Sequence, residues 1–156
     1  MNSEEFHFHE TANDELLEMI PQEELDRVLN QHECDIEPSF LGFVGIYRNL
    51  SEMIPKHWTV IDFGCAYNAQ AYFFRDHKRC IAVDTPGITE RFMTPNCEFH
   101  EMRAQRFIVD LVGGDSDIDL ETTFAICSYV PDEGAQCAVK NWFPNCYVFY
   151  PSGGKK

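Results

Sequence analysis

The chain lacks any run of about 18 apolar residues, so no segment is long and apolar enough to predict a membrane-spanning helix. Its first ten residues, MNSEEFHFHE, are acidic where a secretory signal would be basic and then apolar. We therefore expect a soluble, cytoplasmic protein. With 156 residues, of which 44% are hydrophobic, the chain has enough apolar material to bury the core of a single domain.

Paired cysteine motifs are also missing. The seven cysteines are odd in number and include no C-x-x-C pair, which disfavours a zinc knuckle and a secreted disulfide framework. Four of them fall in candidate strands, where a free thiol behaves as a small buried hydrophobe: Cys80, Cys97, Cys127 and Cys146. We expect these four to be core thiols.

Basic residues are scarce, because 12 Lys and Arg stand against 26 Asp and Glu, for a net charge of -14. The imbalance belongs to the N-terminal third, since residues 1–54 contain 13 acidic and 2 basic residues. Such a surface repels phosphate backbones, so direct nucleic-acid binding is disfavoured. A solvated acidic face is the plain interpretation, and imitation of nucleic acid toward a basic protein partner is the alternative.

Helical spacing dominates this N-terminal third. Two short amphipathic helices are predicted on either side of Pro21, with apolar residues at three- and four-residue spacing: Leu16, Met19, Ile20, Leu25, Val28 and Leu29. A third helix is predicted over residues 40–54, where Ser39 can cap the start and Pro55 stops the helix. Phe43 and Tyr47 lie one turn apart on its apolar stripe, and we interpret both as core residues.

Two histidines near the N-terminus are candidate metal ligands. His7 and His9, with Glu10, could bind a metal from an extended strand, in which alternate residues face the same way. No third ligand is evident, so we predict a mobile terminus and no metal site.

From Trp58 onward, short apolar runs alternate with longer connections. The candidate strands are residues 59–63, 80–84, 97–100, 124–128 and 146–150. Crossover helices are predicted at 69–74, 88–92, 104–112 and 133–143, the third of them ended by Gly113-Gly114. The pattern predicts a Rossmann-like α/β fold, a doubly wound, mainly parallel five-stranded sheet with helices on both faces. Within one domain, we expect residues 1–38 to form an acidic helical extension, 39–150 the α/β core and 151–156 a flexible tail.

The loop after the first strand is the place to look for a ligand, because parallel sheets bind ligands beyond the carboxyl ends of their strands. The stretch VIDFGCAYN (residues 60–68) offers Gly64, Ala66 and Asn68 where a dinucleotide site needs G-x-G-x-x-G. Asp62 precedes these three positions, and a carboxylate beside a pyrophosphate is electrostatically unfavourable. A nicotinamide-dependent dehydrogenase is therefore disfavoured, and a ligand carrying an ammonium group is favoured.

These residues resemble the first motif of the class I S-adenosylmethionine-dependent methyltransferases, an apolar strand followed by an acidic residue and then glycines at alternate positions. The match covers Asp62 and Gly64; Ala66 is small, and Asn68 tolerates a left-handed conformation. The family's second motif is an acidic residue that ends the second strand and binds the ribose hydroxyls. The stretch CIAVDTPG supplies Asp84 there, although Asp84 could instead cap its own turn.

The resemblance implies S-adenosylmethionine as cofactor. The implied binding residues are Asp62, Gly64, Cys65, Ala66, Asn68, Asp84 and Cys127. Near the adenine the family places an acidic or amide residue, for which Glu101, Arg103 and Gln105 are the candidates. Candidates for a general base are Ser128, Tyr129 and Asp132, with ordinary loop residues as the alternative. The stretch Ser128–Pro131 does not reproduce the Asn/Asp-Pro-Pro-aromatic motif of amino-methylating members, so methylation of nucleic-acid amino groups is not supported.

The resemblance covers residues 40–150 and stops after the fifth strand, whereas the family's fold continues through a helix and an antiparallel pair of strands. Two functions stay open. The first is a methyltransferase with an unidentified acceptor. The second is a non-catalytic binding protein that uses its acidic N-terminal surface. A second copy pairing at the exposed sheet edge could replace the missing strands, which would make a homodimer.

Overall fold

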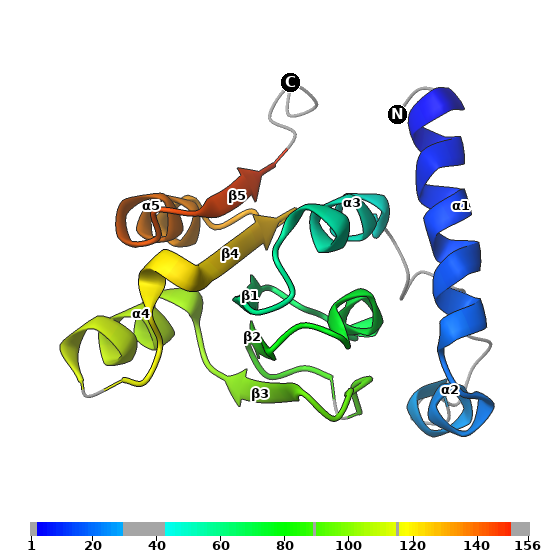
Figure 1. Ribbon diagram of the computed structural model, residues 1–156, viewed down its shortest axis with the longest axis horizontal. Coiled ribbons are helices and arrows are strands. Elements are labelled where there is room, and N and C mark those ends of the chain that lie inside the picture. Colours follow the sequence, from blue (N-terminus) through cyan, green and yellow to red (C-terminus); the bar gives the residue numbers. More distant parts are fainter. Residues whose placement is uncertain (1–2, 30–42, 89, 115, 151–156) are drawn as a thin grey trace.

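The computed structural model describes residues 3–29, 43–88, 90–114 and 116–150. They form a five-stranded sheet in which every pair of neighbouring strands is parallel (Figure 1). In chain order the strands are β1 (Thr59–Phe63), β2 (Arg79–Asp84), β3 (Cys97–Glu101), β4 (Thr123–Ser128) and β5 (Cys146–Phe149). The predicted α/β fold is confirmed, and each predicted strand lies within one residue of its observed bounds.

The order of strands across the sheet is β3-β2-β1-β4-β5. The chain therefore runs outward from β1 to β3, crosses back, and continues from β4 to β5 on the other side. This reversal places the topological switch between β1 and β4, the point at which open α/β sheets hold their ligands. Both switch strands are buried along their whole length, as expected for the centre of a parallel sheet covered on both faces.

Helices cover the two faces of the sheet (Figure 1). One face carries α3 (Gly45–Met53) and the 3-10 helix η2 (Ala69–Phe74), with α1 (Ser3–Met19) packed outside them and α2 (Gln22–Leu29) beside α1. The opposite face carries α4 (Ala104–Gly113) and α5 (Glu133–Trp142), and a short 3-10 helix, η3 (Leu120–Thr122), precedes β4. Each face buries its own hydrophobic cluster, and Leu16 and Val28 from the two N-terminal helices belong to the first cluster. The doubly wound arrangement is thus confirmed.

The third helix is shorter than predicted. It begins at Gly45, not at residue 40, and Val44 at its N-cap supplies no side-chain bond. The backbone N–H of Gly45 instead donates to Nδ1 of His9 at 3.1 Å, so a side chain of α1 satisfies a helix-start donor. The predicted cap, Ser39, lies outside the described residues. The helix does end before Pro55, as predicted.

One predicted crossover helix is a 3-10 helix, and another was wrong. Residues 69–74 form a 3-10 helix that starts after a left-handed Asn68. The described residues of the range 88–92 form no helix, because their polar groups bind the loop after β1; the N–H of Phe92 donates to the carbonyl of Tyr67 at 2.9 Å. The other two, α4 and α5, lie close to their predicted bounds, and α4 ends at Gly113.

The N-terminal histidines lie on a helix, which corrects the extended strand considered for a metal. His9 is buried against α3, whereas His7 is exposed, so the two rings do not share a face. In the described ranges, no group of three or more His, Cys, Asp or Glu side chains could hold a metal ion. None of the helices in the same ranges has both the length and the apolar character needed to cross a bilayer.

Candidate functional site

A cavity of about 430 Å³ opens at the carboxyl edge of the sheet, across the topological switch. Four segments surround it: the ends of β1 and β2, and the chain that follows β3 and β4. It brings together four residues singled out from the sequence, Gly64, Asp84, Tyr129 and Asp132, and two of the adenine candidates, Arg103 and Gln105. The size suits a small organic ligand.

Asp62, the first predicted cofactor residue, does not line this cavity and is 2% exposed. The hydroxyl of Tyr47 on α3 donates to its Oδ1 at 3.0 Å, and Nε2 of Gln70 on η2 donates to its Oδ2 at 2.7 Å. Burial raises the pKa of Asp62 from its ordinary value to about 7, while the two hydrogen bonds act in the opposite direction. Both carboxyl oxygens are therefore bonded to groups of the protein itself.

Asp84 is the last residue of β2 and lines the cavity. Each of its carboxylate oxygens accepts a hydrogen bond from a backbone N–H group. Its Oδ2 accepts from the N–H of Ala66 at 2.8 Å, and its Oδ1 accepts from the N–H of Thr85 at 2.8 Å. The turn-capping role considered from the sequence is thus present, together with a contact to the loop after β1. Each carboxylate oxygen keeps a second lone pair that can accept from a ligand.

The loop after β1 keeps left-handed conformations at all three positions where the resemblance expects glycine. The φ angles are +79° at Gly64, +50° at Ala66 and +66° at Asn68. Asn68 is buried, and its Nδ2 donates to the carbonyl of Phe92 at 2.9 Å. The predicted tolerance of Asn68 for this conformation is confirmed, and Ala66 adopts a left-handed conformation as well. The shape of the turn is therefore kept with one glycine.

Gly64 is required by packing as well as by its φ angle. A Cβ atom at this position would lie 2.5 Å from Cγ2 of Val130, which is closer than any real contact. Val130 follows β4 and lines the same cavity. The residue that approaches Gly64 so closely is therefore a protein side chain, which the sequence alone did not reveal.

Among the adenine candidates, Gln105 combines a place in the cavity lining with an unpartnered acceptor oxygen. It lies in the first turn of α4 and lines the cavity; its Nε2 donates to Oδ2 of Asp132 at 3.0 Å, and its Oε1 is buried without a hydrogen-bond partner among the described residues. Buried acceptors of this kind are uncommon. Arg103 lines the cavity as an exposed residue, and Glu101 does not line it.

The base candidates after β4 differ in their surroundings. Asp132 caps α5 by accepting from the N–H groups of Gly134 and Ala135, and the hydrogen bond from Gln105 is the main cause that lowers its pKa. Tyr129 has a φ of +61°, and its ring stacks on Phe43 at 4.3 Å between centroids. Ser128 is buried away from the cavity lining, and its Oγ has no hydrogen-bond partner among the described residues.

Three further predictions concern buried residues. Cys65 is fully buried and Cys127 lies in the hydrophobic cluster under α4 and α5; burial raises the pKa of both thiols, and neither lines the cavity. The core prediction for the strand cysteines is confirmed for Cys80 and Cys127, and Cys97 and Cys146 are half-buried. Tyr47 is buried as predicted, but Phe43 is 40% exposed, which corrects its assignment to the core.

Sequence reasoning missed Arg91, Gln70 and Val130. Arg91 is 7% exposed, and its Nε donates to the carbonyl of Ala66 at 2.8 Å. A basic residue in a segment expected to be a helix gave no sign of this contact. Gln70 lies eight residues after Asp62 in the sequence. The two are partners because η2 begins directly after the loop and places Gln70 beside the carboxylate.

No family model matches the sequence, and no curated protein matches it. Among solved structures, the chain is similar to one described as "a Putative Type II Methyltransferase from Anaeromyxobacter dehalogenans", with 17% identity and a TM-score of 0.44. The match covers 64% of this chain and 42% of that chain, so the chain spans less than half of that structure. A likeness this distant says nothing about activity, cofactor or substrate.

Proposed function

We propose that the protein binds S-adenosylmethionine in the cavity at the carboxyl edge of the sheet and transfers its methyl group to an acceptor. The observation that carries the proposal is that Asp84 and Gln105 line one cavity, and that Oε1 of Gln105 is buried without a hydrogen-bond partner among the described residues. The spare lone pairs of Asp84 suit the two hydroxyls of a ribose. The unpartnered Oε1 of Gln105 suits the amino group of an adenine.

The remaining lining supports a nucleoside ligand. Apolar side chains form much of the wall and would pack on the faces of a purine: Phe63, Val83, Met102, Val130 and Pro131. The bound sulfonium would supply the reactive methyl group, so the protein needs to supply only alignment and exclusion of water. A dedicated nucleophile is therefore unnecessary. The three hydrogen bonds that Asp132 accepts from the protein do not argue against methyl transfer.

Calorimetry with S-adenosylhomocysteine, the product form of the cofactor, tests the proposal. We expect binding to the wild-type protein and at least tenfold weaker binding to Gln105→Leu, because a buried acceptor for the amino group is lost. Gln22→Leu, an exposed glutamine on α2, is the matched control and should bind as the wild type does. Absence of heat at millimolar ligand would overturn the proposal.

A purine analogue sharpens the test at Gln105. S-inosylhomocysteine carries an oxygen where the adenine has its amino group, so it would face Oε1 of Gln105 with a second acceptor. We expect the wild-type protein to prefer the adenosyl compound at least tenfold and Gln105→Leu to lose most of this preference. An equal preference in both proteins would show that Gln105 does not contact the amino group.

A second function, binding without catalysis, is favoured by the chain after β4. There Tyr129 stacks on Phe43, and Asp132 is bonded to three protein donors with a lowered pKa. Neither is set up as a general base. Binding of S-adenosylhomocysteine without transfer of a labelled methyl group to the protein, nucleic-acid or small-molecule fractions of a cell extract would favour this function over the first.

A further inference from the structure

One arginine crosses from the segment after β2 to the loop after β1. Arg91 is almost fully buried, and its guanidinium donates to three backbone carbonyls: Ala66 at 2.8 Å, Ile88 at 3.1 Å and Thr85 at 3.3 Å. The same guanidinium lies 4.1 Å from the centroid of the Phe99 ring on β3. Arg91 therefore fastens together the loops that follow the first two strands.

Two charged side chains bind the backbone of Ala66, one at its N–H group and one at its carbonyl group. Its N–H donates to Asp84, and its carbonyl accepts from Arg91, each at 2.8 Å. Between these two contacts the φ angle is +50°, a left-handed conformation that is unfavourable for an alanine. Charge-assisted hydrogen bonds are among the strong ones in proteins and can offset this cost. A glycine would adopt the same conformation without them.

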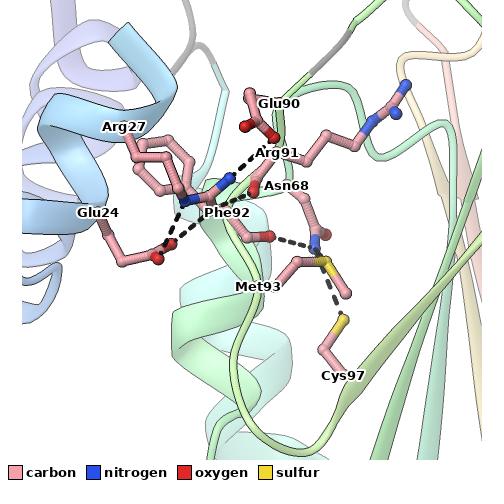
Figure 2. Close-up of polar contacts among 8 residues, drawn as sticks. All are labelled: Glu24, Arg27, Asn68, Glu90, Arg91, Phe92, Met93 and Cys97. Atoms are coloured by element: carbon pink, nitrogen blue, oxygen red, sulfur yellow. Dashed lines mark hydrogen bonds and ion pairs between the residues drawn. The ribbon is translucent and has the colours of Figure 1, made fainter. Parts of the chain in front are cut away.

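The backbone of Arg91 is itself fixed from outside (Figure 2). Arg27 on α2 donates from Nη2 to the carbonyl of Arg91 at 2.6 Å, and its guanidinium pairs with Glu24 and Glu90. On the inner side, Asn68 reaches Phe92 and the sulfurs of Met93 and Cys97, as Figure 2 shows. Residues 90–93 are thus held between an N-terminal helix and the loop after β1.

We propose that Arg91 is a positioning residue, which together with Asp84 imposes on Ala66 the conformation that a second glycine would otherwise supply. Arg27 supports it by fixing its backbone, so the acidic N-terminal helices contribute to the shape of the ligand loop. The effect on ligand affinity rests on the proposed function. The effect on the loop itself does not, and the two can be measured separately.

Hydrogen exchange of the ligand-free protein tests whether Arg91 holds the loop after β1 in its conformation. Arg91→Met keeps an apolar stem against Phe99 but removes the three carbonyl contacts, so amide exchange in residues 64–68 should accelerate about tenfold. Arg79→Met, which removes an arginine paired with Glu98 and Asp117 at the amino end of β2, is the matched control and should leave these amides unchanged. Unchanged exchange in Arg91→Met would overturn the proposal, whatever the ligand.

A double-mutant cycle separates positioning from general packing. In the wild-type background we expect Arg91→Met to weaken S-adenosylhomocysteine binding about tenfold. In the background of Ala66→Gly, the same change should weaken binding less than threefold, because a glycine adopts the left-handed conformation without the contact from Arg91. Equal costs in both backgrounds would show that Arg91 acts only through packing and would overturn the proposal.

The role of Arg91 can still be tested if Arg91→Met does not fold or if the wild-type protein does not bind the ligand. If Arg91→Met does not fold, Arg91→Lys retains the charge but cannot reach three carbonyls at once, and Arg27→Met removes the outer support; each should accelerate exchange of the same amides by a smaller factor. If the wild-type protein binds no S-adenosylhomocysteine, the proposed function fails. The exchange comparison still supports or overturns the role of Arg91 in that case.

Discussion

Asp62 and Asp84 end neighbouring parallel strands, yet one carboxylate is enclosed by the protein and the other borders a cavity. The register explains the difference: Asp62 pairs with Ala82, so Asp84 lies two residues nearer the carboxyl edge of the sheet. At the depth of Asp62, α3 and η2 cover the sheet and supply Tyr47 and Gln70. Asp84 instead accepts from two backbone N–H groups, those of Ala66 and Thr85.

The comparison teaches that an acidic strand end has two separate uses. Asp62 joins three elements through one buried carboxyl group, so its contribution is to the stability of the fold. Asp84 shapes a loop and faces a cavity, so its contribution is to the site. If this division holds, changes at Asp62, Tyr47 and Asp84 have different effects on stability and on ligand binding.

The largest effect concerns the pH dependence of stability. The pKa of Asp62 is about 7 in the folded protein and near 3.8 when unfolded, so the folded state binds the extra proton between these values. The free energy of unfolding should therefore fall as pH rises from 4 to 7, by roughly 4 kcal/mol for a shift of about three units, and stay level above pH 7. Urea unfolding at several pH values measures this fall.

Asp62→Asn should remove that fall, because the group no longer titrates. Asp14→Asn, at an exposed position on α1, controls for the loss of one negative charge. If Asp62→Asn kept the wild-type pH dependence, the carboxyl group would have to be solvated in solution, and the contrast with Asp84 would disappear.

An intermediate effect is expected at the hydroxyl that faces Asp62. Tyr47→Phe keeps the ring packed against Phe74 but leaves Oδ1 of Asp62 buried without its donor. We expect a loss of about 1–3 kcal/mol in the free energy of unfolding at pH 8, with a smaller loss at pH 5, where the carboxyl group is protonated. Tyr147→Phe on β5 controls for removal of a tyrosine hydroxyl. A greater loss at pH 5 than at pH 8 would contradict the assignment.

The strands were predictable from sequence because their signal is local. Runs such as Val60-Ile61 and Ile81-Ala82-Val83 are apolar on both sides, as central parallel strands must be, and they predicted the sheet within one residue. The segment 88–92 was not predictable in the same way. Its backbone is held by Asn68 and Arg27, residues 20 or more positions away, so long-range contacts override its local helical pattern.

The residue types of the site were predictable from the sequence, but the directions in which its side chains point were not. The acidic ends of β1 and β2 and the left-handed turn follow from the sequence of the loop. Whether a carboxylate faces a ligand depends on what covers it, and the covering residues, Tyr47 and Gln70, come from separate helices. Val130 is a similar case, because its contact with Gly64 joins loops 66 residues apart in the chain.

The smallest effect on stability, and the one that most sharpens the comparison, is expected at Asp84. Asp84→Asn replaces one acceptor oxygen by an NH2 group that cannot accept from the N–H of Ala66 or Thr85, which should cost about 1 kcal/mol of unfolding free energy. The same change should weaken S-adenosylhomocysteine binding about tenfold, since an acceptor for a ribose hydroxyl is lost. Asp62→Asn should show the reverse balance, with a large change in the pH dependence of stability and little change in affinity. Affinity that depended on Asp62 and not on Asp84 would place the ligand on the α3 side of the loop, away from the cavity, because the two carboxylates lie at different depths in the sheet.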